Sequence, residues 1–129
     1  MNHPIRPGDV AAPAAAYELA MMSPAGSRLL HSAGIVGARP DGSVPPDVGD
    51  QATEVWRTIR RLLDEAGFTA ADIVSYTTYV VAGEELAPVM AARDTALLPH
   101  TAASTLVTVP ALARPEWKVE VAVVAARVD

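Results

Sequence analysis

The stretch WKVEVAVVAARV, residues 117–128, decides the fold of this chain. It is rich in β-branched residues and is expected to form a β-strand, in which successive side chains point to opposite faces. One face carries four small apolar residues: Val119, Val121, Val123 and Ala125. The other face carries Glu120 together with Ala122, Val124 and Ala126. Because both faces are mainly apolar, we expect both faces of the sheet around this strand to be covered.

Two helices are expected before this strand. Over residues 50–66, apolar residues recur with the spacing of a helix that buries one side: Val55, Ile59, Leu62, Leu63 and Ala66. Asp50 is suited to cap the start of this helix, and Gly67 is suited to end it in a left-handed conformation. Residues 84–97 predict a second helix, which Pro99 ends.

Four further segments have the composition of strands: residues 17–22, 29–35, 73–81 and 104–109. The turn residues Ser23-Pro24-Ala25-Gly26 predict that the first two of these strands form a hairpin. Residues 1–13 are expected to be an irregular lead-in, and residues 38–49, rich in proline and glycine, a loop.

The predicted order of elements is β-β-α-β-α-β-β, within a single α+β domain that spans residues 1–129. Two helices can cover only one face of a mixed sheet. The apolar second face therefore predicts that other copies of the chain cover it, in an obligate oligomer.

Composition excludes several classes of function. The chain has 129 residues, a formal net charge of −5 and no cysteine, which argues against nucleic acid as the main partner and excludes thiolate chemistry. The three histidines, His3, His31 and His100, lack the spacing of a metal site, so we expect neither a metal nor a cofactor. No apolar run approaches the roughly 18–20 residues that span a bilayer. The N-terminus has no apolar signal segment, which predicts a soluble cytoplasmic protein.

Glu120 is the leading candidate for chemistry, because a carboxylate among apolar strand residues is costly to desolvate. Functional sites accept this cost, since a carboxyl group with a raised pKa suits acid–base catalysis near neutral pH. The alternative interpretation is a salt bridge across an interface between copies of the chain, to an arginine such as Arg28 or Arg114.

Two other segments could contribute to a ligand site. Ser32, Ala33 and Gly34 end the predicted second strand and offer a hydroxyl and backbone N–H groups. Tyr17 could supply a phenol. The alternative is that these residues form an ordinary strand end and a packed tyrosine.

In their order along the chain, these segments resemble the Rid family, also called YjgF or L-PSP. The matching pieces are APAAAY at 12–17, LLHSAGIV at 29–36, Asp41-Gly42, the helix from Gln51 to LLDEAGF at 62–68, ADIVSYTTYVV at 71–81, VTVPAL at 107–112 and KVEVAVVA at 118–125. The resemblance implies a chorismate-mutase-like protomer in a homotrimer with clefts between subunits. It also implies hydrolysis of enamines or imines such as 2-aminoacrylate, with a glutamate that acts on water and an arginine that binds the substrate carboxylate.

Residue by residue, the glutamate of the family matches Glu120, the strand-end serine matches Ser32 and the early tyrosine matches Tyr17. The arginine is missing, because Ser104 stands in its place. Serine offers at most one neutral hydrogen bond, so on the order of 1.5–3 kcal/mol of charged hydrogen bonding is lost. Met90 stands where the family has an asparagine.

These departures predict a cleft edged by Tyr17, Met90 and Leu106 that suits a neutral, larger or more hydrophobic molecule than the usual substrate. Arg28 and Arg93 are the two arginines that could replace the missing one. The first hypothesis is an enzyme that hydrolyses or tautomerises an imine or enamine. The second is a trimer that binds a small molecule and has lost the reaction. Ribonuclease activity, a historical label for part of the family, is disfavoured by the acidic charge.

Overall fold

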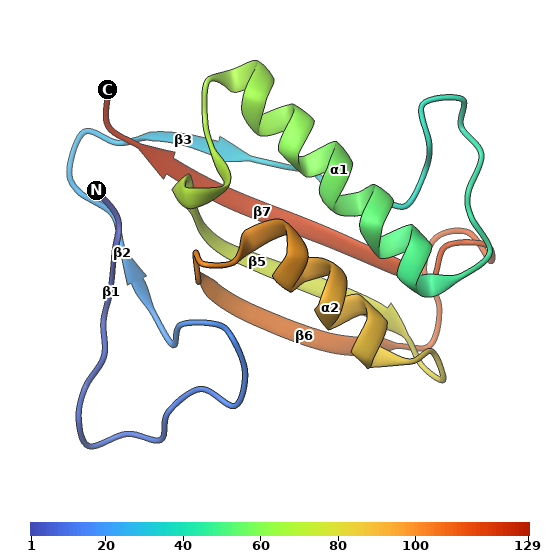
Figure 1. Cartoon of the computed structure of the whole chain (residues 1–129), viewed down its shortest axis with the longest axis horizontal. Coiled ribbons are helices and arrows are strands. Elements are labelled where there is room, and N and C mark those ends of the chain that lie inside the picture. The colour runs from blue at the N-terminus through green and yellow to red at the C-terminus, as the bar shows by residue number, and fades with distance from the viewer.

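The strand β7 (Val119–Arg127) lies inside the main sheet of the computed structural model, which describes residues 1–129 (Figure 1). On one side β7 pairs antiparallel with β5 (Ile73–Val81), and on the other side with β3 (Arg28–His31) and β4 (Ile35–Val36). The edge strand β6 (Ala103–Val109) runs parallel to β5, so the order across the sheet is β3-β7-β5-β6. The sheet is mixed, and the predicted α+β class is confirmed.

Both helices, α1 (Val48–Ala66) and α2 (Leu86–Leu97), lie on the same face of this sheet (Figure 1). α1 begins before Asp50 because the side chain of Asp47 is the cap and accepts a hydrogen bond from the backbone N–H of Asp50 at 3.0 Å. Gly67 ends α1 with a φ of +78°, as predicted. Neither helix is long and apolar enough to cross a membrane.

The core lies between these helices and the sheet. From α1, Val55, Ile59 and Leu63 are buried, and they belong to the same apolar cluster as Val119, Val121, Val123 and Ala125 of β7. Leu62, which the helical spacing placed in the buried stripe, is 41% exposed. Ala66 is exposed as well. Ala52 and Trp56 are buried in addition, so the buried stripe of α1 is displaced from the predicted one.

Gln51 ties the start of α1 to the start of β7, although it is a polar residue with no exposed surface. Its amide nitrogen donates to the carbonyl oxygens of Pro45 at 2.8 Å and Glu116 at 2.9 Å, and its amide oxygen accepts from the backbone N–H of Lys118 at 2.9 Å. These three hydrogen bonds meet the needs of the buried amide and place the chain just before Glu120.

The predicted N-terminal hairpin is wrong. β2 (Met21–Met22) pairs with β1 (His3–Pro4), which lies in the segment predicted to be irregular, and β3 pairs with β7. β1 and β2 form a separate two-stranded sheet, and β3 satisfies backbone donors and acceptors on one side of the long strand β7. Tyr17 accordingly lies in a bend outside any strand.

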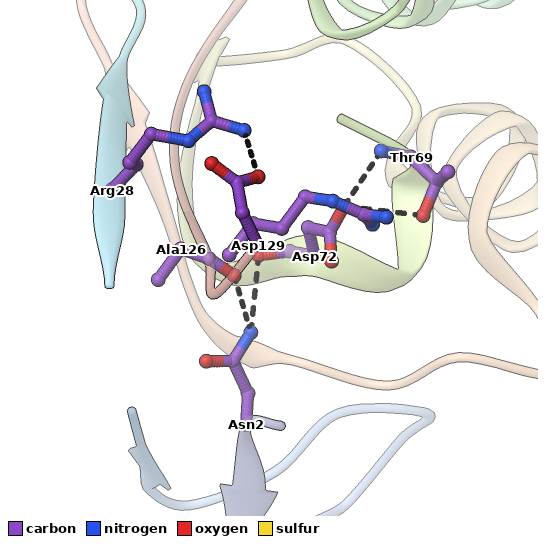
Figure 2. A network of polar contacts seen from close by, with 7 residues as sticks. Asn2, Arg28, Thr69, Asp72, Ala126 and Asp129 are labelled. Carbon is purple, nitrogen blue, oxygen red and sulfur yellow. Dashed lines mark hydrogen bonds and ion pairs between the residues drawn. The ribbon is translucent and has the colours of Figure 1, made fainter. Parts of the chain in front are cut away.

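A polar network fastens the two ends of the chain to each other (Figure 2). The side-chain amide of Asn2 donates to the carbonyl oxygen of Ala126 at 2.9 Å. Asp72, at the end of the short helix η1 (Ala70–Asp72), accepts from the backbone N–H of Thr69 at 2.7 Å and from Arg127 at 3.1 Å. These contacts hold the C-terminal end of β7 in place.

No helix covers the second face of the sheet (Figure 1). The residues of β7 alternate between buried on the helix face and partly exposed on the other, which we call the open face. The open face carries Tyr79 of β5, Ala122 and Val124 of β7, and the largely exposed Leu29 and Val107 at the two sides. The apolar second face predicted from the sequence is present, and it is uncovered in the single chain.

The two adjacent leucines of α1 test this description of the core. Leu63→Ala is expected to lower the free energy of unfolding by about 2–5 kcal/mol, because it leaves a cavity among buried side chains. Leu62→Ala removes the same atoms from an exposed position and is expected to cost less than about 1 kcal/mol. Urea denaturation of both variants measures the difference, and equal losses would contradict the packing described here.

Candidate functional site

A hollow lies at the edge of the sheet, between α2 and β6. It has a volume of about 330 Å³ and is lined by Ala14, Ala15, Tyr17, Leu86, Met90, Arg93, Ser104 and Leu106. Ser104 and Leu106 alternate along β6, so both side chains point to the same face. Leu86 and Met90 are one turn apart on α2. The structure therefore brings together four residues that the sequence singled out: Tyr17, Met90, Ser104 and Leu106.

Arg93 is the charged residue of this hollow. It follows Met90 by three residues on α2, which puts both side chains on one side of the helix. Its side chain is only 8% exposed, and its Nε donates to Asp94 Oδ1 at 2.9 Å. The sequence left open whether Arg93 or Arg28 takes the place of the missing arginine, and of these two only Arg93 lines the hollow.

Arg28 is engaged elsewhere. It begins β3, at the opposite edge of the sheet from β6. Its guanidinium donates to Asp129 Oδ1 at 2.6 Å (Figure 2) and lies over the ring of Phe68, 5.0 Å from its centre. Arg28 therefore belongs to the contacts around the C-terminus.

Glu120 lies on the open face of the sheet, opposite Tyr79 on one neighbouring strand and Val36 on the other. It is half-buried in the single chain and makes no hydrogen bond or ion pair within it. The alternative of an ion pair across an interface stays a prediction, and within the single chain Arg28 pairs with Asp129 while Arg114 lies near Glu116 at 3.9 Å. Its carboxylate is free to act on another molecule.

The turn between β3 and β4 packs directly against Glu120. A Cβ atom at Gly34 would lie 2.0 Å from Oε2 of Glu120, so any larger residue would displace the carboxylate from this position. Ser32 holds this turn to β7, since its hydroxyl accepts from the N–H of Val123 at 2.9 Å and donates to the carbonyl of Ala33 at 2.8 Å. The N–H groups of Ala33 and Gly34 in this turn have no partner in the chain.

The two groups of residues lie on opposite faces of the sheet. Glu120 pairs in register with Tyr79, which points to the open face, whereas Ser104 pairs with Tyr76, which is buried on the helix face. β5 also lies between β7 and β6. A single chain therefore presents Glu120 and the hollow at α2 and β6 as two separate half-sites.

Next to Tyr17, the buried carboxylate of Glu18 pairs with the largely exposed Arg6, a contact that the sequence does not predict. Glu18 is 6% exposed, and Arg6 donates to its carboxylate through Nε at 3.0 Å and Nη2 at 2.6 Å. Thr101 donates to the same carboxylate at 2.6 Å. The hydrogen bonds from Arg6 and then Thr101 lower the pKa of Glu18 from about 4.5 to about 2. These partners are distant in the sequence, so only the folded chain reveals them.

A larger hollow, of about 400 Å³, lies between α1 and α2 and is lined by Arg57, Arg60 and Arg61 around Trp56. It contains none of the residues that the sequence predicted for the site. Its lining also holds no carboxylate, histidine or tyrosine that could move a proton. We therefore place the candidate site at Glu120 and at the edge of β6.

The ion pair of Glu18 makes a prediction about pH. Because its pKa is lower in the folded than in the unfolded chain, the stabilisation is fully present above about pH 4.5 and is lost as the pH falls towards 2. Thermal melting between pH 7 and pH 3 should show this loss. Glu18→Gln should be less stable at pH 7 and lose less on acidification. Glu65→Gln, at a position that is 84% exposed, should keep the pH dependence of the original protein, and an unchanged profile in Glu18→Gln would contradict this account.

Comparison with known proteins agrees with the sequence resemblance. Residues 9–127 match the family model described as Endoribonuclease L-PSP, and no curated protein matches the chain. A protein of unknown function of the conserved Rid family, YyfB from Yersinia pestis, is 29% identical, with a TM-score of 0.86 over 98% of both chains. NMB1025 of Neisseria meningitidis, a YjgF family member, is 25% identical, with a TM-score of 0.70 over 88% of both chains. The fold is also that of Escherichia coli TdcF, crystallised with bound serine, which is 20% identical with a TM-score of 0.72 over 98% of this chain and 99% of that one. This chain belongs to the Rid family, also called YjgF or L-PSP.

Proposed function

We propose that the protein hydrolyses or tautomerises an imine or enamine of a small molecule, in a cleft that forms between two copies of the chain, with Glu120 as the acid–base group. The observation that carries this proposal is the carboxylate of Glu120, which is unpaired within the chain, lies on an uncovered sheet face and adjoins Gly34 in a turn with two free backbone N–H groups. Membership of the Rid family supports the class of reaction.

The open face supports an oligomer. Its partly exposed apolar side chains lose contact with water only if another protein surface covers them. A second copy on this face can bring its own α2–β6 edge to Glu120, which joins the two half-sites that one chain keeps apart. The homotrimer implied by the family is the arrangement we propose.

The proposed reaction uses water as the second substrate. Glu120 accepts a proton from water as its oxygen attacks the imine carbon, and it returns the proton to the nitrogen, which gives a carbinolamine. The carbon–nitrogen bond then breaks, and the products are a carbonyl compound and ammonia. The N–H groups of Ala33 and Gly34 are the donors that would hold the reacting polar atoms. An enamine first takes a proton on carbon and loses one from nitrogen, and so becomes the imine.

Ser104 argues against ordinary 2-aminoacrylate as the substrate. Five of the eight residues around the hollow are apolar: Ala14, Ala15, Leu86, Met90 and Leu106. This lining supports a substrate with a larger apolar part. It also favours the second candidate function, a trimer that binds a small molecule without converting it. Calorimetric binding of a ligand that is recovered unchanged would favour the second function.

The role of Glu120 is tested by Glu120→Gln, which keeps the shape of the side chain and removes its basicity. Ammonia release from imines made in situ by amino-acid oxidases, from acidic and neutral amino acids, should fall about 10²–10⁴-fold in kcat/KM. Glu65→Gln, on the exposed side of α1, should leave the rate unchanged. Size-exclusion chromatography with light scattering checks that the oligomer is intact. A full rate in Glu120→Gln would contradict the mechanism.

The shared cleft is tested by mixing two inactive variants. Glu120→Gln destroys one half-site, and Ser104→Trp fills the hollow of the other. If a cleft takes Glu120 from one copy and the hollow from another, random mixed oligomers should regain about a quarter of the original activity, since one cleft in four is then intact. The two variants are unfolded and refolded together, with each one refolded alone as control. No recovery in oligomers shown to be mixed would contradict a shared cleft.

A further inference from the structure

We propose that Arg93, which lies on α2, binds the carboxylate of the substrate. It would then do what the family does with an arginine at the position of Ser104. The inference rests on the proposed function, and it gives the substrate class: an imine or enamine that carries a carboxylate together with an apolar side chain. This differs from the neutral substrate that the loss of the arginine predicts from the sequence alone.

The first argument is the state of the guanidinium. Arg93 as a whole is 7% exposed, and burial of a charge without partners is costly. Its hydrogen bond to Asp94 uses Nε alone, and neither Nη1 nor Nη2 donates to any group of the chain. The edge of the guanidinium that holds two terminal nitrogens can therefore still bind a carboxylate with two parallel hydrogen bonds.

The second argument is the surroundings of the guanidinium. No aspartate or glutamate lines the hollow, and Asp94, the ion-pair partner of Arg93, contacts Nε alone, so an anion bound in the hollow would meet no carboxylate of the chain there. The hydroxyls of Tyr17 and Ser104 line the same hollow, and neither makes a hydrogen bond within the chain. Three unused donor groups in one hollow match a carboxylate, which only accepts hydrogen bonds.

The third argument concerns the rest of the ligand. Leu86 and Met90 of α2 and Leu106 of β6 form an apolar wall beside these donors. A methyl group is too small to cover this wall, whereas a branched or unbranched aliphatic side chain would bury against it. The hollow of about 330 Å³ has the size of a small metabolite site.

Binding of the product class tests the inference without any need for turnover. The probe is 4-methyl-2-oxopentanoate, and its neutral counterpart is 4-methylpentan-2-one, in which a methyl group replaces the carboxylate. Isothermal titration calorimetry in phosphate-free buffer should show tighter binding of the keto acid by the original protein. Arg93→Met should weaken keto-acid binding about ten- to hundredfold and leave ketone binding unchanged. Arg60→Met removes an exposed arginine of α1 that lines the larger hollow and lies outside the hollow of Arg93. It should change the binding of neither the keto acid nor the ketone.

A second variant restores the charge from the other wall. Ser104→Arg, added to Arg93→Met, should recover keto-acid binding, because it returns a guanidinium to the same hollow from β6. This gain also shows that a loss in Arg93→Met is not a loss of folding, and Arg93→Lys provides a second test if Arg93→Met does not fold. Equal binding of keto acid and ketone by the original protein would overturn the inference. If inorganic phosphate bound as tightly as the keto acid, and its binding also depended on Arg93, the assignment of a carboxylate would be overturned.

The two proposals fail in distinguishable ways. Glu120→Gln should bind the keto acid as the original protein does, because Glu120 acts on the imine carbon and not on the carboxylate. Keto-acid binding that depends on Arg93, in a protein that hydrolyses none of the imines offered, would support this inference and contradict the proposed function. Imine hydrolysis by Arg93→Met at the rate of the original protein, for acidic and neutral substrates alike, would support the proposed function and contradict this inference.

Discussion

The alternation of side chains along β7 is the constraint on which the rest of the structure depends. Val119, Val121 and Val123 are buried beneath α1 and α2, and this forces Glu120 and its neighbours to the opposite face. A shift of one residue in the pairing of β7 would bury the carboxylate in the core and expose the valines. The position of the proposed acid–base group thus follows from the same hydrophobic pattern that holds the helices on the sheet.

The residues around each half-site are held by contacts that have no chemical role of their own. Gln51 places the start of β7, Ser32 holds the turn beside Glu120, and Glu18 pairs with Arg6 next to Tyr17. Each of these groups uses most of its hydrogen-bonding capacity within the chain. Glu120 and the terminal nitrogens of Arg93 do not, and this contrast separates the structural polar residues from those available to a ligand.

The proposed replacement of one arginine by another illustrates why the position of a charge in sequence says little about its position in space. Ser104 lies on β6 and Arg93 on α2, yet both line one hollow because α2 packs over the edge strand. Loss of a group from one wall can therefore be offset from the other. The substrate class follows from the set of donors that face the hollow, whichever element carries them.

Much of the fold could be predicted because it depends on short-range patterns: the spacing of Val55 and Ile59 defines α1, and alternation defines β7 and its two faces. The family and the matching of Glu120 also came from the sequence. The pairing of β1 with β2, the burial of Glu18 and the choice of Arg93 over Arg28 did not, because each depends on residues distant in the chain that only tertiary packing brings together. The sequence by itself determined which groups are present and which faces are apolar. The tertiary structure decided which of those groups meet, since that depends on strand pairing and helix packing and not on local spacing.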